Sequence, residues 1–169
     1  AAASRSALKE HLAGKGVTQE AMAEAGLIVT GDDIPVSFDR FRDRIMFPIE
    51  DLRGRIVAFG GRAMAADAPA KYLNSPETAL FQKGSLLYRA AAAREASRSA
   101  GTIVVVEGYV DVIACAEAGI GHAVAPLGTA MTERQLELIW RMVPEPILCF
   151  DGDAAGIRAA ERMIDVALP

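Results

Sequence analysis

The sequence predicts an α/β protein, α+β over the whole chain, whose second part contains a parallel sheet. Continuous β-branched and apolar runs at residues 103–106 and 147–150 are typical of strands covered on both faces. Helical segments and short links alternate with these runs, which favours right-handed crossovers and a parallel sheet. The chain has 169 residues, 51% of them hydrophobic, which is enough apolar material to bury a core.

Residues 4 to about 27 are predicted to be helical. Apolar residues have helical spacing from residue 4 to residue 27, and Gly14 and Gly16 interrupt the pattern. Thr18 then stands where an N-cap would begin a second helix.

A β hairpin is expected next. Residues 44–49 and 55–59 are apolar or alternating, and the turn-forming residues 50–54 lie between them. The following stretch, residues 66–76, contains two prolines and is predicted to be a loop.

The second part of the chain is predicted to alternate helices and strands. Alanine has the highest helix propensity, so the Ala-rich residues before Gly101 are expected to form a helix that this glycine ends. The predicted helices are 90–100, 109–118, 132–142 and 154–167, and the predicted strands are 103–106, 123–125 and 147–150.

Charge divides the chain near residue 100. Residues 1–100 carry 14 Lys and Arg against 12 Asp and Glu, a net charge of +2, whereas residues 101–169 carry 4 against 10, a net charge of −6. We therefore predict a basic N-terminal subdomain at residues 1–100 and an acidic α/β subdomain at residues 101–169.

Several protein classes are excluded by composition. No apolar run approaches the roughly 20 residues that a membrane span needs, so we expect a soluble, cytoplasmic protein that uses no membrane. Cys115 and Cys149 lie in apolar stretches without the spacing of a zinc site and are predicted to be reduced core thiols. Trp140 is also assigned to the core.

Acidic residues follow the predicted strands. Glu107 comes directly after the first β-branched run, and Asp151 and Asp153 follow the last one. Asp111 lies four residues after Glu107, in the first turn of the next helix. Because carboxyl ends of parallel strands share one edge of a sheet, these carboxylates are expected to converge. Oxygen ligands without His or Cys favour Mg²⁺ or Mn²⁺.

Two glycines accompany these acids. Gly108 and Gly152 lack a Cβ, so we expect the backbone to bend sharply there and to approach an ion or a phosphate closely. Helix capping, worth about 1 kcal/mol each, is the alternative explanation for Asp111 and Asp153. It does not explain Glu107, which directly follows an apolar strand.

Two segments around these acids resemble the acidic motifs of a Toprim domain: VEGYVDV at 106–112 and FDGDAAG at 150–156. Upstream, FRDRIMFPI at 41–49, FGGR at 59–62 and KYLNSPET at 71–78 resemble the bacterial DnaG-type primases. The resemblance extends from about residue 17 to the end of the chain. It implies a Toprim-type parallel sheet flanked by helices, preceded by a small helical and β-hairpin basic subdomain.

The resemblance also implies a function, the metal-dependent, DNA-templated synthesis of short RNA primers for DNA replication. Glu107 would be the acid closest to the chemistry, Asp151 and Asp153 would be metal ligands, and Asp111 would be of second rank. The implied partners are a single-stranded DNA template, ribonucleoside triphosphates and, through a further C-terminal domain, the replicative helicase at the replication fork.

Basic and polar residues of the first part would hold phosphates of the template or the nucleotide. Tyr109 could stack on a base or ribose, or it could simply be packed at the start of its helix. The candidates for nucleotide or DNA binding are Arg44, Arg62, Lys71, Asn74, Lys83 and Tyr109.

Members of the resembled family have a further Asp-Pro-Asp motif after the last helix seen here, an N-terminal zinc ribbon and a C-terminal helicase-interacting domain. We expect from this that the metal site of this sequence is incomplete, that it binds Mg²⁺ weakly, and that an open sheet edge pairs with a second copy. Whether such a fragment is itself active stays open.

Two other functions remain open at this point. The same carboxylates and metal could cleave a phosphodiester, as in a Toprim nuclease or topoisomerase. A degenerate Toprim fold could instead be a non-catalytic module that binds single-stranded DNA or a nucleotide.

Overall fold

The computed structural model describes residues 1–128 and 130–168. The chain divides into two compact units that are interleaved in sequence. The first unit comprises residues 1–49 and 56–81, and the second comprises residues 50–55 and the chain from residue 82 onward. The boundary after residue 100, which we predict from charge, stays a prediction.

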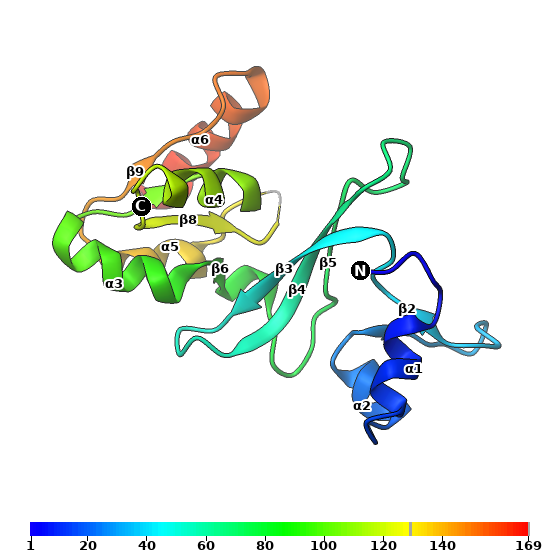
Figure 1. The fold of residues 1–169 in the computed structure, drawn as a ribbon. Coiled ribbons are helices and arrows are strands. Elements are labelled where there is room, and N and C mark those ends of the chain that lie inside the picture. The colour runs from blue at the N-terminus through cyan, green and yellow to red at the C-terminus, as the bar shows by residue number, and fades with distance from the viewer. Residues whose placement is uncertain (129, 169) are drawn as a thin grey trace. The chain divides into compact units, whose positions relative to one another are not determined.

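The first unit begins with two short helices and two small sheets (Figure 1). Thr18 caps the second helix, because its hydroxyl oxygen accepts a hydrogen bond from the N–H of Ala21 at 3.2 Å. The helical prediction and this cap are confirmed. The elements are α1 (Ala7–Ala13), α2 (Gln19–Glu24), β1 (Ile28–Val29), β2 (Phe38–Asp39), β3 (Arg44–Glu50), β4 (Ile56–Ala63) and β5 (Tyr72–Asn74).

A buried acid joins the start of the chain to the first small sheet. Strands β1 and β2 pair antiparallel, and Asp39 lies in β2 with only 2% of its surface exposed. Its carboxylate accepts hydrogen bonds from the N–H groups of Leu8 (2.7 Å) and Lys9 (3.0 Å), at the N-terminus of α1. The positive end of the helix thus compensates the buried charge.

The predicted hairpin is present and carries a third strand. Strands β3 and β4 are neighbours, and the turn between them is closed by the N–H of Asp51, which donates to the carbonyl of Arg55 at 2.9 Å. Strand β5 pairs antiparallel with β4. The prediction of a loop over residues 66–76 is therefore wrong for residues 72–74. Three residues next to a proline-containing loop are too few to show an alternating pattern, and pairing with β4 decides their conformation.

The second unit alternates helices and strands as predicted. Its sheet has the order β6-β8-β7-β9. The elements are η1 (Lys83–Ser85), β6 (Leu87–Tyr88), α3 (Ala90–Ala100), β7 (Val104–Val105), α4 (Tyr109–Glu117), β8 (Ala123–Pro126), α5 (Glu133–Trp140), β9 (Ile147–Leu148) and α6 (Ala154–Ala167).

The sheet of the second unit is mixed. Strand β7 pairs in parallel with both β8 and β9, which confirms the predicted parallel core. Strand β6 pairs antiparallel with β8, so the sheet is not purely parallel. The two-residue strand β6 lies directly before α3 and has no periodicity of its own. Helices α3 and α4 flank β8 on opposite sides in the view of Figure 1, and Gly101, with φ +73°, ends α3 as expected.

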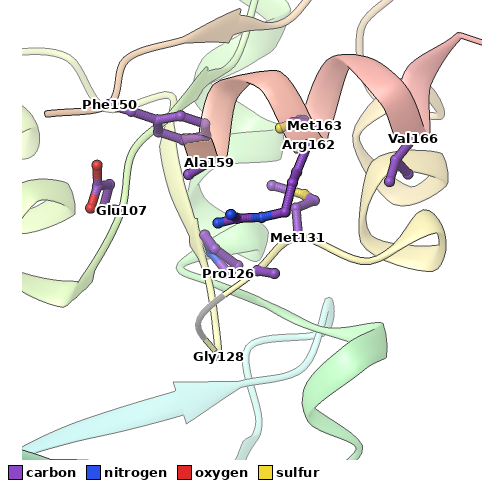
Figure 2. Close-up of a pocket in the computed structure, with 10 residues that line it drawn as sticks. Glu107, Pro126, Gly128, Met131, Phe150, Ala159, Arg162, Met163 and Val166 are labelled. Atoms are coloured by element: carbon purple, nitrogen blue, oxygen red, sulfur yellow. The ribbon is translucent and has the colours of Figure 1, made fainter. Parts of the chain in front are cut away.

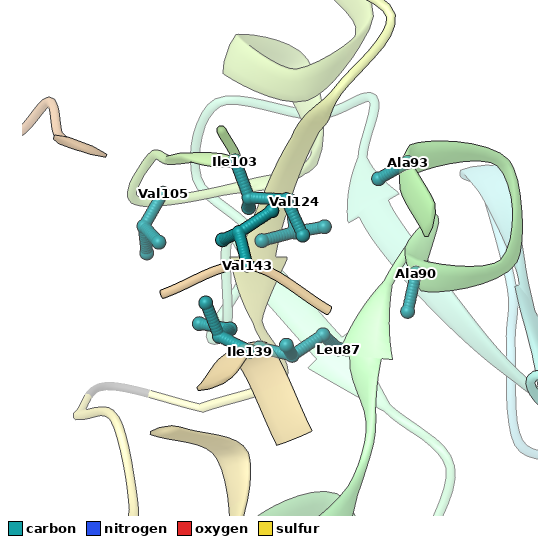
Figure 3. Packing of buried hydrophobic residues seen from close by; sticks show 8 residues of the cluster. All are labelled: Leu87, Ala90, Ala93, Ile103, Val105, Val124, Ile139 and Val143. Atoms are coloured by element: carbon teal, nitrogen blue, oxygen red, sulfur yellow. The ribbon is translucent and has the colours of Figure 1, made fainter. Parts of the chain in front are cut away.

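A hydrophobic cluster joins the sheet to α3 and α5 (Figure 3). No member has more than 4% of its surface exposed, which makes this cluster the core of the second unit. The cluster comprises Leu87, Ala90, Ala93, Ile103, Val105, Val124, Ile139 and Val143.

Three burial predictions are wrong. Strand β9 lies at the edge of the sheet, and Ile147 is 52% exposed, so this strand is not covered on both faces. Trp140 is 44% exposed, because α5 turns the neighbouring Ile139 into the core instead. Cys149 is exposed and Cys115 is only partly buried. An apolar run in the sequence therefore does not show which of its members face the core.

Within residues 1–128 and 130–168, no helix has the length and apolar character that crossing a bilayer requires.

Candidate active site in the second unit

Two acidic loops meet at the carboxyl ends of β7 and β9. Glu107 follows β7, and Asp151 follows β9 after two further residues. An oxygen of the Glu107 carboxylate, Oε1, accepts a hydrogen bond from the backbone N–H of Asp151 at 2.8 Å. The two loops meet at one edge of the sheet, but the carboxylates that we expected to converge there do not form a group of three or more within the described residues. Both residues are exposed, so the edge is open to ligands.

Gly156, in the first turn of α6, is the glycine that this arrangement requires. A Cβ at this position would lie 2.8 Å from Oε1 of Glu107 and 2.9 Å from the backbone carbon of Asp151. Any side chain would therefore push the two loops apart. The close approach of Gly108 and Gly152 to an ion or a phosphate stays a prediction, and their backbone conformations do not themselves require glycine. Gly108 is extended, neither glycine has a positive φ, and a Cβ at Gly152 would meet nothing within 4 Å.

Asp153 caps α6. Its Oδ1 accepts hydrogen bonds from the N–H groups of Ala155 (2.8 Å) and Gly156 (2.9 Å). These two bonds, the one from Gly156 first, hold the pKa of the Asp153 carboxyl below its usual value, because they stabilise the ionised form. Asp153 therefore stays charged at neutral pH.

Asp111 caps α4 in a similar way. Its Oδ2 accepts a hydrogen bond from the backbone N–H of Gly108 at 3.0 Å. The capping explanation thus accounts for one oxygen of both Asp111 and Asp153. Each carboxylate has a second oxygen, so capping is compatible with a further role.

The carboxylate oxygens of these residues are chemically suited to bind a hard divalent cation, but the side chains do not surround a common point. Within residues 1–128 and 130–168, no group of three or more His, Cys, Asp or Glu side chains lies close enough together to hold a metal ion. Glu107, Asp111 and Asp153 each use one carboxylate oxygen in the hydrogen bonds above. Their second oxygens, with the carboxylate of Asp151, are the ligands that the second unit offers.

A cavity of about 430 Å³ lies beside Glu107, between the strand ends and α6 (Figure 2). Glu107, Pro126 and Phe150 line it from the strand ends, and Met131 from the loop before α5. Gly128 and Ala130 also line it, and helix α6 contributes Ala159, Arg162, Met163 and Val166.

Sequence reasoning missed this cavity and its arginine. The helix residues that line it, at positions 159, 162, 163 and 166, have the spacing i, i+3, i+4 and i+7 of one helix face. A single arginine within an otherwise apolar stripe, eleven residues after Asp151, was the available signal.

The polar candidates of the first unit are held by the hairpin sheet. The guanidinium of Arg44 donates to the carbonyls of Ala70 (2.9 Å), Gly61 (3.2 Å) and Lys71 (3.3 Å), which ties β3 to the segment around β5. The carbonyl of Asn74 accepts two hydrogen bonds from Arg40, at 3.0 and 3.2 Å. Both residues thus have a structural role.

Arg62 and Lys71 differ from Arg44. The Nε of Arg62 is buried and has no hydrogen-bond partner among the residues that the structure describes. The side chain of Lys71 is exposed. A buried donor without an acceptor is costly, but because protein covers this Nε, it does not by itself mark a site that an external anion can reach.

Lys83 and Tyr109 belong to the second unit. The backbone carbonyl of Lys83, in η1, accepts a hydrogen bond from Nε2 of Gln135 at 2.9 Å. The ring of Tyr109 is buried and meets Tyr88 edge to face, with 4.6 Å between the ring centroids. Packing accounts for Tyr109, and stacking on a base would require its ring to be uncovered.

Known proteins are similar to this chain in sequence and fold. Residues 1–94 match the family model described as the N-terminal domain of the DNA primase catalytic core, and residues 101–169 match the Toprim domain. A DNA primase of Pseudomonas aeruginosa is 52% identical over 96% of this chain and 24% of its own length. A DNA primase of Escherichia coli K12 is 47% identical over 92% of this chain and 26% of its own length. The chain thus spans about a quarter of these curated relatives.

Solved structures agree with the sequence matches. A DNA primase domain from Pseudomonas aeruginosa superimposes with a TM-score of 0.93 at 51% identity, over 100% of this chain and 52% of that one. A DnaG primase catalytic domain bound to single-stranded DNA superimposes with a TM-score of 0.87 at 43% identity, over 98% of this chain and 51% of that one.

Proposed function

Because this chain belongs to the DNA primase family, we propose that it carries out DNA-templated synthesis of short RNA primers from ribonucleoside triphosphates, for DNA replication. The observation that supports this most directly is the hydrogen bond between Glu107 and the backbone of Asp151. It brings the two Toprim motifs together at the open edge of a sheet, where α/β proteins bind their ligands.

The proposed cofactor is Mg²⁺ or Mn²⁺, for which Glu107, Asp151 and Asp153 would supply oxygen ligands, with Asp111 in a secondary position. To share one ion, these side chains would have to draw closer together than they lie in the structure. When bound, such a cation neutralises triphosphate charge and aligns the attacking 3′ hydroxyl with the leaving pyrophosphate. Glu107 also fixes the Asp151 loop through its Oε1. Asp153 contributes a carboxylate that stays ionised, because two α6 N–H groups lower its pKa.

The proposed phosphate-binding residues are Arg62, Lys71 and Lys83. For Arg62, which is half-buried with its Nε covered, a phosphate would bind to the terminal nitrogens of the guanidinium. We propose an indirect role in nucleotide or DNA binding for Arg44, Asn74 and Tyr109, in which they hold the neighbouring parts of the chain in place. Arg44 donates hydrogen bonds to three backbone carbonyls, and Tyr109 packs on Tyr88. Arg–phosphate bonds of this kind position a template without reading its sequence.

The proposed partners are single-stranded DNA, ribonucleoside triphosphates and the replicative helicase, at the replication fork in the cytoplasm. Single-stranded DNA has the best support, because it is bound by a DnaG primase catalytic domain that is 43% identical to this chain in the part that the two have in common. The helicase follows from family resemblance alone.

A primer-synthesis assay tests the proposal. The full-length protein is incubated with single-stranded template, labelled ribonucleotides and Mg²⁺ or Mn²⁺, and short labelled RNA is the expected product. Glu107→Gln should reduce the yield at least 100-fold, whereas the matched change Glu117→Gln, at the exposed end of α4, should not.

The other possible products define the alternatives. Cleavage of the template without RNA synthesis would replace the proposal with a nuclease or topoisomerase function. Binding of template without either product would indicate a non-catalytic module.

A further inference from the structure

The cavity beside Glu107 contains one cationic side chain. Its walls are mainly apolar, from Phe150, Met131 and Met163, and its ionisable side chains are Glu107 and Arg162 (Figure 2). Figure 2 shows the guanidinium of Arg162 extending along the cavity toward the side on which Glu107 lies. A cavity of about 430 Å³ with few polar groups has the size and lining of a small-molecule site.

The charge of Arg162 is not used within the second unit. The side chain of Arg162 forms no hydrogen bond or ion pair with any residue that the structure describes, although it lines the same cavity as Glu107. Two other exposed arginines of this unit are paired, Arg98 with Glu95 at 2.9 Å and Arg141 with Glu137 at 3.7 Å. Arg134 and Arg158 are exposed without an ion pair among the described residues, but neither lines this cavity. Arg162 thus presents a full set of guanidinium donors to the cavity.

The position of Arg162 on α6 is set by packing. Met163, the next residue, is 3% exposed and anchors this face of the helix in the unit. Ala159 and Val166, one turn away on either side, line the cavity with it. The helix therefore holds the start of the arginine side chain at the cavity wall, and only the distal atoms are free to adjust.

We propose that this cavity binds a nucleotide and that Arg162 holds one of its phosphate groups. The planar guanidinium matches a phosphate in a bidentate manner, and the apolar walls suit the faces of a ribose or base. Glu107 lies at the same cavity, so a phosphate on Arg162 would be next to the proposed cation ligands. This inference rests on the proposed function, because it adds Arg162 to the same site.

Two sources could supply that phosphate. One is the triphosphate of an incoming ribonucleotide, and the other is the phosphodiester at the 3′ end of the growing primer. The chemistry that Arg162 recognises is the same, so the two sources are separated by experiment.

The test compares Arg162→Gln with the wild-type full-length protein. The control is Arg134→Gln, which removes an exposed arginine from α5 outside this cavity. In the primer-synthesis assay, Arg162→Gln should lower kcat/KM about tenfold or more, the usual effect of losing one charge-assisted bond, and Arg134→Gln should lower it less than twofold. Arg162→Lys keeps the positive charge but lacks the planar, bidentate guanidinium, so it should recover part of the loss.

Separate measurements on ribonucleotides and on an RNA–DNA hybrid show which of the two phosphates Arg162 binds. If Arg162 holds the incoming triphosphate, the KM for ribonucleotides rises and calorimetric binding of a single ribonucleotide without template weakens about tenfold. If it holds the primer end, these values stay constant and the affinity for a preformed RNA–DNA hybrid falls instead. Either result supports the proposal.

Other outcomes overturn it. If wild-type protein makes primers and Arg162→Gln equals it in ribonucleotide KM, nucleotide binding and hybrid affinity, Arg162 is an ordinary solvated arginine and only this inference fails. If wild-type protein makes no primers, the proposed function itself fails. Circular dichroism and thermal unfolding of each variant check that the fold is intact. If Arg162→Gln does not fold, the same binding and kinetic measurements on Arg162→Lys decide, and wild-type values for that variant overturn the proposal.

Discussion

Oε1 of Glu107 accepts the backbone N–H of Asp151 at 2.8 Å, although the two residues are 44 positions apart in the chain. Glutamine at position 107 would keep an acceptor oxygen for this bond, whereas alanine would not. We expect Glu107→Gln to change the free energy of unfolding by less than about 0.5 kcal/mol and Glu107→Ala to lower it by about 0.5–1.5 kcal/mol. Urea unfolding of both variants measures this. Equal losses would show that the bond does not depend on the side-chain oxygen.

A second prediction concerns Gly156. Alanine normally stabilises a helix by up to about 1 kcal/mol relative to glycine. At position 156 its Cβ would collide with the backbone of Asp151 and with Oε1 of Glu107, so we expect Gly156→Ala to destabilise the protein by about 1–3 kcal/mol. Gly152→Ala is the matched control, because a Cβ there meets nothing within 4 Å. A Gly156→Ala protein as stable as the control would show that the loops can move apart freely.

A third prediction concerns pH. The pKa of Asp153 is lowered in the folded protein by the N–H groups of Gly156 and Ala155. Its ionised form therefore contributes stability above the unfolded-state pKa of about 3.9, and this contribution is lost as the pH falls through the lower, folded-state pKa. Asparagine keeps the cap without titrating. We expect the Tm of wild-type protein to fall more steeply below about pH 4 than that of Asp153→Asn.

The Asp153→Ala variant completes this experiment. It removes the cap at every pH, so its Tm should lie below that of Asp153→Asn at pH 7 and in acid alike. Parallel Tm curves for wild-type protein and Asp153→Asn below pH 4 would contradict the proposed role of the ionised cap.

A fourth prediction concerns two neighbours in α5. Ile139 is fully buried in the core cluster, whereas Trp140 is 44% exposed. We expect Ile139→Ala to cost about 2–5 kcal/mol in the free energy of unfolding and Trp140→Ala markedly less, despite the larger side chain that it removes. Denaturant titrations of both variants test the order. The reverse order would mean that the helix presents its other face to the sheet.

Much of this fold was predictable, because each long element contains its own signal. Helix α3 has its run of alanines and Gly101 at its end, and α2 has Thr18 at its start. Strand β7 has the β-branched residues of a buried strand. Such signals depend on a few neighbouring residues and are therefore visible in the sequence.

The short strands were not predictable in the same way. Strands β5 and β6 have three and two residues, and each exists because it pairs with a strand from another part of the chain. The exposure of Ile147 likewise depends on the place of β9 in the strand order. None of these features is encoded locally.

The candidate site was likewise predictable only in part. Glu107 and Asp151 were found because they follow strands, and strand ends have a known location in an α/β sheet. The need for glycine at position 156 and the place of Arg162 in the cavity were missed. Both depend on the packing of α6 against the two loops, which the sequence alone does not specify.

The interleaving of the two units in sequence has a consequence for limited proteolysis. Residues 50–55 belong to the second unit, although residues 56–81, which belong to the first, follow them. One cut after residue 81 would leave residues 50–55 on the N-terminal fragment, although they belong to the second unit. The backbone carbonyl of Leu52, to which Arg94 donates a hydrogen bond at 3.1 Å, would be on that fragment too. No single protease cleavage can release either unit whole, and a nicked molecule should stay together until it is denatured.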